Sequence, residues 1–465
     1  MTISRRDWLA ASAALALAPL FGTRARAAPL PRDADIVVIG AGAAGISAAR
    51  RVMAAGRRVI VLEASGQIGG RCATDASGFE APFDRGARWL HTPDSNALIK
   101  LARPAGIDVA PSPPSQKVRI GRRNARAGET EDLLATLVRA SRAIDEAARK
   151  SDVSCAAALP KDLGDWGGTI DFILGGYATG KDLRDLSALD QFRAQDRAID
   201  VATRQGLGAL MVKLGDGVPV ALSTPATRVS WSGRDIGVET PAGRIAARGV
   251  ILTVSSNVLA SGAIKFTPEL PKRQLDAAAK LSLGSYDRIA LQLAGNPLGL
   301  GRDELLIEQS SDARTGALFA NIGGSSLCTV DVAGAFGRGL AAQGEPAMIA
   351  FAVEWLTKLF GSDIAKAVKK SAATNWNVSP FIQGAMSGAV PGGQGSRRVL
   401  TEPMGNLFIA GEATHETLWG TVDGAWESGE RAAVAALAKL APLKPPEPEK
   451  PTRPSKRRTK SSGAE

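Results

Sequence analysis

Residues 35–63 read DIVVIGAGAAGISAARRVMAAGRRVIVLE, and this stretch decides the fold of the chain around it. The apolar run 35–39 is typical of a buried parallel strand, and the glycines Gly40, Gly42 and Gly45 follow it at once. A segment with helical character comes next and ends at a further glycine. The order of strand, glycine-rich turn and helix predicts the first half of a Rossmann-like unit.

A second apolar strand, residues 58–62, follows that helix and ends on Glu63, 18 residues after Gly45. A carboxylate at this position can accept hydrogen bonds from both hydroxyls of a ribose. Gly40 permits the tight turn, Gly42 lets a pyrophosphate approach the backbone, and Gly45 allows the helix to pack closely on the strand. The alternative, a glycine-rich turn in an ordinary α/β unit, leaves the acid unexplained. The stretch therefore predicts dinucleotide binding.

The segments beyond Glu63 indicate which dinucleotide is bound. Residues 64–71, ASGQIGGR, add a second glycine pair and Arg71 just past the acidic strand, an extension that a nicotinamide enzyme does not need. Together with residues 84–91, DRGARWLH, and residues 407–432, LFIAGEATHETLWGTVDGAWESGERA, this segment resembles the flavin-containing amine oxidase family. The similarity runs from about residue 33 to about residue 440.

The resemblance implies an α/β fold in which a Rossmann-like FAD-binding domain is interleaved with an α+β substrate-binding domain. The expected segments are an export signal at 1–27, FAD-binding segments at 33–105, 206–288 and 395–441, substrate-binding segments at 106–205 and 289–394, and a disordered tail at 442–465.

The resemblance also implies which residues contact FAD. In the family, the equivalents of Glu412 reach the ribityl–phosphate region, Thr421 and Val422 reach the flavin ring, and Val229 lies beside the adenine. The full set of expected cofactor contacts is Gly40, Gly42, Ala44, Gly45, Glu63, Ala64, Gly70, Arg71, Gly86, Ala87, Arg88, Trp89, Val229, Trp376, Gly411, Glu412, Thr421 and Val422.

Residues 374–393, TNWNVSPFIQGAMSGAVPGG, correspond to the segment of monoamine oxidases that ends in a flavin-linking cysteine and a cage tyrosine. Ala385 and Met386 occupy those two positions here, and Thr421 occupies that of the second cage tyrosine. The resemblance therefore implies noncovalent FAD and no two-tyrosine cage. The motifs GEATH and GTVDGA are more similar to the polyamine oxidase branch.

Three residues are expected to be catalytic: His91, Arg288 and Trp419. A histidine titrates near neutral pH and can bias a bound amine towards its neutral form, or it can simply hydrogen-bond to backbone near the flavin. Arg288 stands where the family usually has a lysine that holds a water near flavin N5. Arginine is bulkier and permanently charged, so oxygen reactivity and flavin reduction are both expected to differ.

The implied reaction moves a hydride from the α-carbon of an amine to flavin N5 and gives an imine that water hydrolyses. The expected partners are a polyamine or another primary or secondary amine, and O2 or a periplasmic electron acceptor. O2 would yield hydrogen peroxide. Two alternatives stay open: a flavin dehydrogenase or desaturase acting on an apolar or cyclic substrate, and a flavin-binding scaffold without turnover.

Composition agrees with a globular enzyme of two or three domains, at 465 residues and 45% hydrophobic. The net charge of +11 includes +3 from residues 1–27 and +4 from residues 442–465, which leaves +4 for the body. Aromatic residues make up only 5%, which argues against a nucleic-acid partner that stacks on the surface. With three cysteines (Cys72, Cys155 and Cys328) in no CxxC pair, and two histidines, no metal site is expected.

The first residues have the features of an export signal. The twin arginines Arg5 and Arg6 precede an apolar run at 8–21 and the cleavage pattern 25–27, and that run is short for a membrane span. This order resembles a twin-arginine signal, which implies a periplasmic or secreted protein. The alternative is an uncleaved N-terminal helix on a cytoplasmic enzyme.

Coarse secondary structure follows from periodicity. Helices are predicted over residues 131–150 and 182–202, and strands over much of 206–256. Residues 290–390 mix helices, such as 354–370, with the strand-like runs IALQLA and AMIAFAV.

Overall fold

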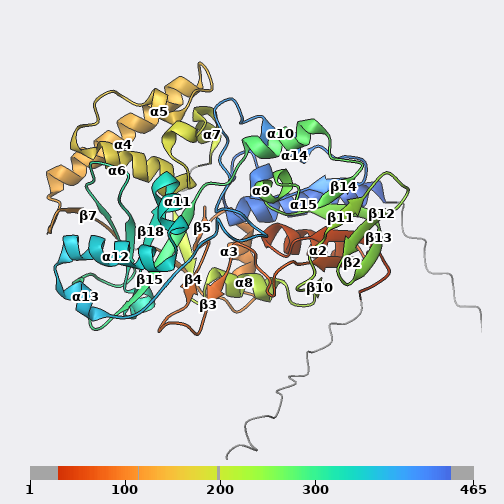
Figure 1. Cartoon of the computed structure of the whole chain (residues 1–465), viewed down its shortest axis with the longest axis horizontal. Helices are drawn as coiled ribbons and strands as arrows, with labels where there is room; N and C mark the ends of the chain where they lie inside the picture. Colours follow the sequence, from red (N-terminus) through yellow and green to blue (C-terminus); the bar gives the residue numbers. More distant parts are fainter. Residues whose placement is uncertain (1–29, 114, 196–198, 441–465) are drawn as a thin grey trace, which may run out of the picture.

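The computed structural model describes residues 30–113, 115–195 and 199–440 (Figure 1). The predicted export signal and C-terminal tail lie outside these residues. No helix within them combines the length and apolar character needed to cross a bilayer.

The first sheet is built on the glycine-turn strand. β1 (Asp33–Ile39) lies between β2 (Val59–Leu62) and β13 (Gly243–Leu252), parallel to both. Their apolar runs are long because both faces of a parallel sheet are covered. The sheet also contains β10 (Val220–Ala221), β11 (Arg228–Ser230), β12 (Ile236–Thr240), β14 (Lys265–Thr267) and β20 (Leu407–Ile409).

Helices cover both faces of this sheet (Figure 1). One face packs against α2 (Ala43–Ala54), α8 (Leu207–Leu214) and α15 (Val422–Lys439). A Cβ on Gly429 of α15 would lie 2.1 Å from the Ala44 carbonyl, so the two helices touch backbone to backbone. The other face packs against α9 (Ser256–Ala260), α10 (Lys272–Lys280) and α14 (Ser396–Thr401).

The second sheet is mostly antiparallel and has the order β19–β15–β18–β17–β16–β7–β8. Its strands are β7 (Gln116–Ile120), β8 (Arg123–Asn124), β15 (Tyr286–Leu293), β16 (Glu304–Glu308), β17 (Ala317–Ala320), β18 (Leu327–Ala333) and β19 (Val368–Ala373). The helices α11 (Gly334–Ala342) and α12 (Glu345–Phe360) pack on it, and α4 (Ala127–Ala148) lies in the same lobe (Figure 1).

A small sheet brings distant segments together near the first lobe. β5 (Trp89–His91) pairs antiparallel with β9 (Asp200–Thr203), which also pairs with β6 (Val109–Pro111). In sequence, the strands of the two larger sheets alternate: β1 and β2 of the first sheet precede β7 and β8 of the second, β10–β14 of the first precede β15–β19 of the second, and β20 of the first comes last. The predicted interleaved α/β fold is confirmed.

Two secondary-structure predictions are wrong. The strand-like run AMIAFAV, residues 347–353, lies inside α12, and the predicted helix 354–370 ends early, giving way to α13 (Asp363–Ala367) and strand β19. A continuous apolar run has no periodicity that separates a buried helix from a buried strand. Pro346 in the first turn was the local signal for a helix start. The predicted helix 182–202 is reduced to a 3-10 turn (Leu183–Asp185) and α7 (Ala188–Arg193) before β9 begins.

Candidate active site

A cavity of about 1810 Å³ extends from the carboxyl ends of β1 and β2 to the second sheet. Ligands of open α/β sheets bind at this end of the strands. The predicted site residues that line the cavity are Gly40, Gly42, Ala44, Glu63, Ala64, Gly70, Arg71, Gly86, Ala87, Arg88, Trp89, His91, Arg288, Trp376, Gly411, Glu412, Trp419, Thr421 and Val422.

The turn between β1 and α2 has the geometry of a phosphate site. Gly40 has φ of +109°, and a Cβ on Gly45 would lie 1.9 Å from the Gly40 carbonyl, so the helix can approach the strand only without that side chain. Gly45 itself does not line the cavity. No side chain caps the N-terminus of α2, and Gly42 and Ala44 face the cavity there. The free amides of this turn suit a pyrophosphate.

Glu63 is held rigidly at the end of β2. Its Oε2 accepts a hydrogen bond from the Ala41 amide at 2.7 Å, and its Oε1 accepts from the Ser65 amide and hydroxyl at 2.8 and 2.7 Å. The carboxylate is nearly buried and lines the cavity. Its remaining lone pairs can accept hydroxyl donors from a ribose.

The side chain of Val229 is not on the cavity wall, and its predicted place beside the adenine stays a prediction. Val229 is 0% exposed and belongs to the core behind the sheet. The wall is formed instead by Pro225, Ala226 and Thr227, which precede β11. The resemblance located the strand but not the residue at which the chain leaves the cavity and enters the sheet.

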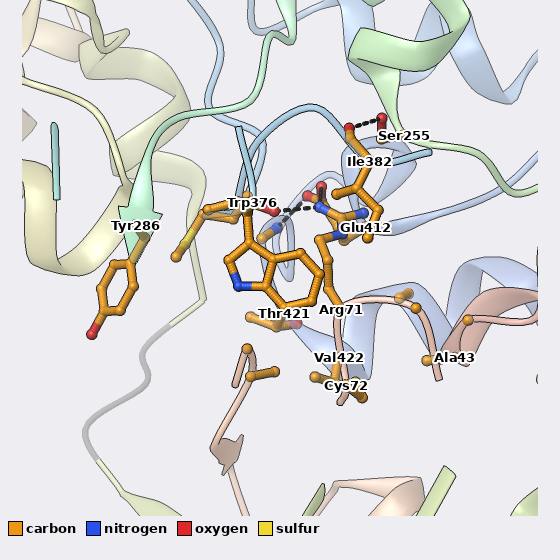
Figure 2. A pocket seen from close by; sticks show the side chains of 18 of the residues that line it. Ala43, Arg71, Cys72, Ser255, Tyr286, Trp376, Ile382, Glu412, Thr421 and Val422 are labelled. Atoms are coloured by element: carbon orange, nitrogen blue, oxygen red, sulfur yellow. Dashed lines mark hydrogen bonds and ion pairs between the residues drawn. The ribbon is translucent and has the colours of Figure 1, made fainter. Parts of the chain in front are cut away.

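Arg71 and Glu412 form an ion pair on the cavity wall (Figure 2). Arg71 Nη1 donates to Glu412 Oε1 at 2.8 Å and to the Ala385 carbonyl at 2.6 Å. Glu412 also accepts from the Ser387 hydroxyl at 2.6 Å and the Gly420 amide at 2.8 Å. Burial alone would raise the pKa of Glu412, but Arg71 and Ser387 outweigh it and lower this pKa. The carboxylate is therefore charged at neutral pH.

Trp376 presents its indole to the cavity beside Arg71 (Figure 2). Asp287 accepts a hydrogen bond from the Trp376 amide at 2.9 Å, and the indole Nε1 donates to the Arg85 carbonyl at 3.0 Å.

Burial raises the pKa of the Cys72 thiol to about 12, with Asp84 adding to the effect. Cys72 is therefore protonated at neutral pH and is a poor nucleophile.

His91 is paired across strands with Asp200, a residue that no sequence motif singled out. His91 Nδ1 lies 2.5 Å from Asp200 Oδ1, and both residues line the cavity. Asp423, in the first turn of α15, accepts from the His91 amide and from the Asn96 side chain. The backbone of His91 and the Nδ1 edge of its ring are thus held by hydrogen bonds, whereas Nε2 has no hydrogen-bond partner among the described residues.

Arg288 lies on β15 and reaches the cavity wall. Its Nε donates to Asp331 Oδ1 at 3.0 Å, and its Nη1 donates to the carbonyls of Asp84 and Gly86 at 2.7 and 2.6 Å. Burial alone would lower the pKa of Arg288, but Asp331 and then Tyr286 raise it above its ordinary value. The guanidinium is a fixed charge locked to the segment before β5.

The aromatic wall of the cavity was not predicted. Tyr177 and Tyr286 are the only two tyrosines in the sequence, and both line the cavity with ring centroids 6.1 Å apart. They do not occupy the two cage positions of the monoamine oxidases, and the rarity of tyrosine was the only signal that could have found them. Trp419 is also on the wall, but it is almost completely buried and donates to the Asp190 carbonyl.

A mostly parallel sheet with a glycine turn and a ribose-type acid, next to a cavity of about 1810 Å³, is typical of a dinucleotide-dependent enzyme. The profile of the flavin-containing amine oxidoreductase family matches residues 43–437. The chain belongs to this family, and its cofactor is FAD. The turn, Glu63, Arg71 and Glu412 fit that group.

Individual relatives agree with this assignment. The chain is 27% identical to lysine-specific histone demethylase 2 of Homo sapiens, over 87% of this chain and 54% of that protein. It is 26% identical to polyamine oxidase 5 of Oryza sativa subsp. japonica, over 86% of this chain and 87% of that protein. The chain spans about half the length of the histone demethylases that it matches.

Solved structures show the same fold. Putrescine oxidase bound to putrescine superposes with a TM-score of 0.75 at 20% identity, covering 88% of this chain and 100% of that one. Cyclohexylamine oxidase from Brevibacterium oxydans IH-35A gives a TM-score of 0.72 at 20% identity, covering 88% of this chain and 99% of that one.

Proposed function

We propose that this protein oxidises an amine at its α-carbon, with noncovalent FAD as the acceptor. The observation that carries the proposal is the His91–Asp200 pair, which lies in one cavity with both the nucleotide site and the aromatic wall. Family membership and the names of the putrescine, cyclohexylamine and polyamine oxidases support it.

The residues that would hold FAD are those of the Gly40–Gly42 turn, Glu63, Arg71 and Glu412. When bound there, FAD would supply the acceptor for the hydride of the amine's α-carbon and the route for its electrons to O2, with release of hydrogen peroxide, or to a periplasmic carrier. Trp376 and the buried thiol of Cys72 add apolar wall at this end of the cavity.

His91 would remove the proton that makes the amine unreactive. The Asp200 carboxylate accepts a hydrogen bond from Nδ1–H, which leaves Nε2 as the acceptor. A substrate ammonium can donate to Nε2, and the neutral amine that results can lose a hydride. Asp423 and Asn96 hydrogen-bond to the backbone of His91 and thereby fix the position of its ring in the cavity.

Anaerobic mixing of the purified flavoprotein with a panel of amines tests the proposal. We expect at least one amine to bleach the flavin, and His91→Gln to slow bleaching about 10- to 1,000-fold and alter its pH profile. An unchanged pH profile would leave His91 with a purely structural role. Arg288→Lys should chiefly alter reoxidation by O2, measured after the flavin has been reduced.

The same measurements separate the other two functions. If the flavin bleaches but O2 does not reoxidise it, the protein is a dehydrogenase with another acceptor. If no donor bleaches a tightly bound flavin, the protein is a scaffold.

We also propose that the protein is exported with FAD already bound, on the basis of the N-terminal sequence alone. Changing Arg5 and Arg6 together to lysine should move the flavoprotein from the periplasmic to the cytoplasmic fraction. An unchanged distribution would contradict export through a twin-arginine signal.

A further inference from the structure

Arg88 is a buried cation in the cavity wall that has no anionic partner within the part of the chain that the structure describes. Its side chain is 6% exposed, and its Nη2 donates to the Thr329 hydroxyl at 2.8 Å. The guanidinium lies 4.5 Å from the centroid of the Phe319 ring and 5.5 Å from that of Trp89. Among the described residues, no carboxylate lies within 4.0 Å of it. An unpaired charge in such a position costs several kcal/mol.

The nearby carboxylates are already engaged. Asp331 accepts from Arg288 Nε at 3.0 Å and from the Tyr286 hydroxyl at 2.7 Å. Asp84 accepts from the Thr74 hydroxyl and from the Leu207 amide. Two arginines therefore share this part of the wall with one carboxylate that pairs with Arg288. Burial, and then the charge of Arg288, lower the pKa of Arg88, in keeping with an uncompensated charge.

We propose that Arg88 binds a carboxylate of the substrate, and that the substrate is an amine carrying such a group rather than a polyamine. The proposal rests on the proposed amine oxidation. The ammonium group would lie at the His91–Asp200 pair, and the body of the molecule against Tyr177 and Tyr286.

The charges on this wall discriminate between the two substrate classes. At this part of the wall, the second cationic centre of a polyamine would meet the charges of Arg88 and Arg288, and the Asp331 carboxylate there already pairs with Arg288; Asp145 also lines the cavity, but no described ion pair joins it to Arg88. An amino acid, whether its amine is α or ω to the carboxylate, supplies the missing anion and keeps one ammonium for His91. The planar guanidinium can hold a carboxylate through two N–H donors.

Matched substrate pairs test this assignment. Phenylalanine is compared with phenylethylamine, and 6-aminohexanoate with hexylamine, by anaerobic flavin reduction. In at least one pair we expect the member with the carboxylate to react faster at limiting concentration. Arg88→Met should lower that preference about 10- to 100-fold, and Arg88→Lys should lower it less, because lysine keeps the charge but not the fork.

Binding of phenylacetate, which cannot be oxidised at an amine, gives a second readout by calorimetry. Wild type should bind phenylacetate more tightly than phenylacetamide, and Arg88→Met should abolish the difference. Arg398→Met, an exposed arginine of α14 outside the cavity, is the matched control and should change neither readout.

Failure of this inference and failure of the proposed function give different results. If only the amines without a carboxylate bleach the flavin, and Arg88→Met leaves their rates and phenylacetate binding unchanged, the carboxylate site is refuted while amine oxidation stands. If Arg88→Met merely loses FAD and the substrate preference is unaltered, Arg88 serves the cofactor and the inference is also refuted. If nothing bleaches the flavin, the proposed oxidation fails, and phenylacetate binding still decides whether Arg88 binds carboxylates.

Discussion

Removing the Asp190 carboxylate should destabilise the protein more than any surface change of the same size. Asp190 and Arg397 are both 0% exposed, and they form two parallel hydrogen bonds, Nε to Oδ1 at 2.7 Å and Nη2 to Oδ2 at 2.6 Å. Asp190→Ala leaves the guanidinium buried with the Ser387 hydroxyl, the Ala413 carbonyl and the Trp419 ring, none of which carries a charge. Breaking one side of such a pair costs about 3–5 kcal/mol.

The assay is urea unfolding at a fixed FAD concentration, followed by fluorescence and circular dichroism, with coincident transitions required. Replacing both partners, as Asp190→Leu with Arg397→Met, should cost less than the single change because no charge is left buried. Glu402→Ala breaks the exposed ion pair with Arg273 and should cost less than about 1 kcal/mol. If Asp190→Ala costs no more than Glu402→Ala, the reasoning from buried charge is refuted.

Three further predictions follow from the site. Acid precipitation should release FAD into the supernatant because Ala385 replaces the linking cysteine; colour that stays in the pellet would refute noncovalent binding. Glu63→Ala should weaken FAD by about 1–3 kcal/mol, measured by titrating apoprotein, and full flavin content at low FAD would show that Glu63 is not the ribose ligand. Burial raises the pKa of Asp287 to about 6, above the ordinary 3.8, so the folded state holds this proton more tightly than the unfolded chain. Stability from Asp287 should therefore decline as pH rises from about 4 to 6, and Asp287→Asn should lack that part of the decline; parallel profiles for the two proteins would contradict it.

The parts of the site that were predictable from sequence are local. Gly40, Gly45 and Glu63 act within one strand–turn–helix–strand unit, and their spacing alone places them at the same end of the sheet. By contrast, His91 and Asp200 are 109 positions apart and meet through the register of two three- to four-residue strands. Nothing in the sequence near either residue specifies that register.

The same limit applies to the other residues that the resemblance named. The resemblance named Val229, which lies in β11, but it gave no sign that the residues just before β11 line the cavity. It likewise placed Arg288, but not the Asp331 and backbone carbonyls that neutralise and fix it. Partners of buried charges come from distant strands, so a motif can identify one member of a pair and still leave the electrostatics of the site unknown.

Three buried arginines show why those partners decide function. Arg397 forms two hydrogen bonds with the Asp190 carboxylate. Its role is structural, because its charge is neutralised within the protein. Arg288 has Asp331 and two carbonyls, which fix its position but leave it on the cavity wall. Arg88 has one hydroxyl, two aromatic rings and, within the described residues, no ion-pair partner. Burial of a guanidinium without a negatively charged partner is unfavourable, and Arg88 is the arginine of the three that lacks one among the described residues. A substrate carboxylate would supply that partner, so the surroundings of Arg88 favour a substrate that carries a negative charge.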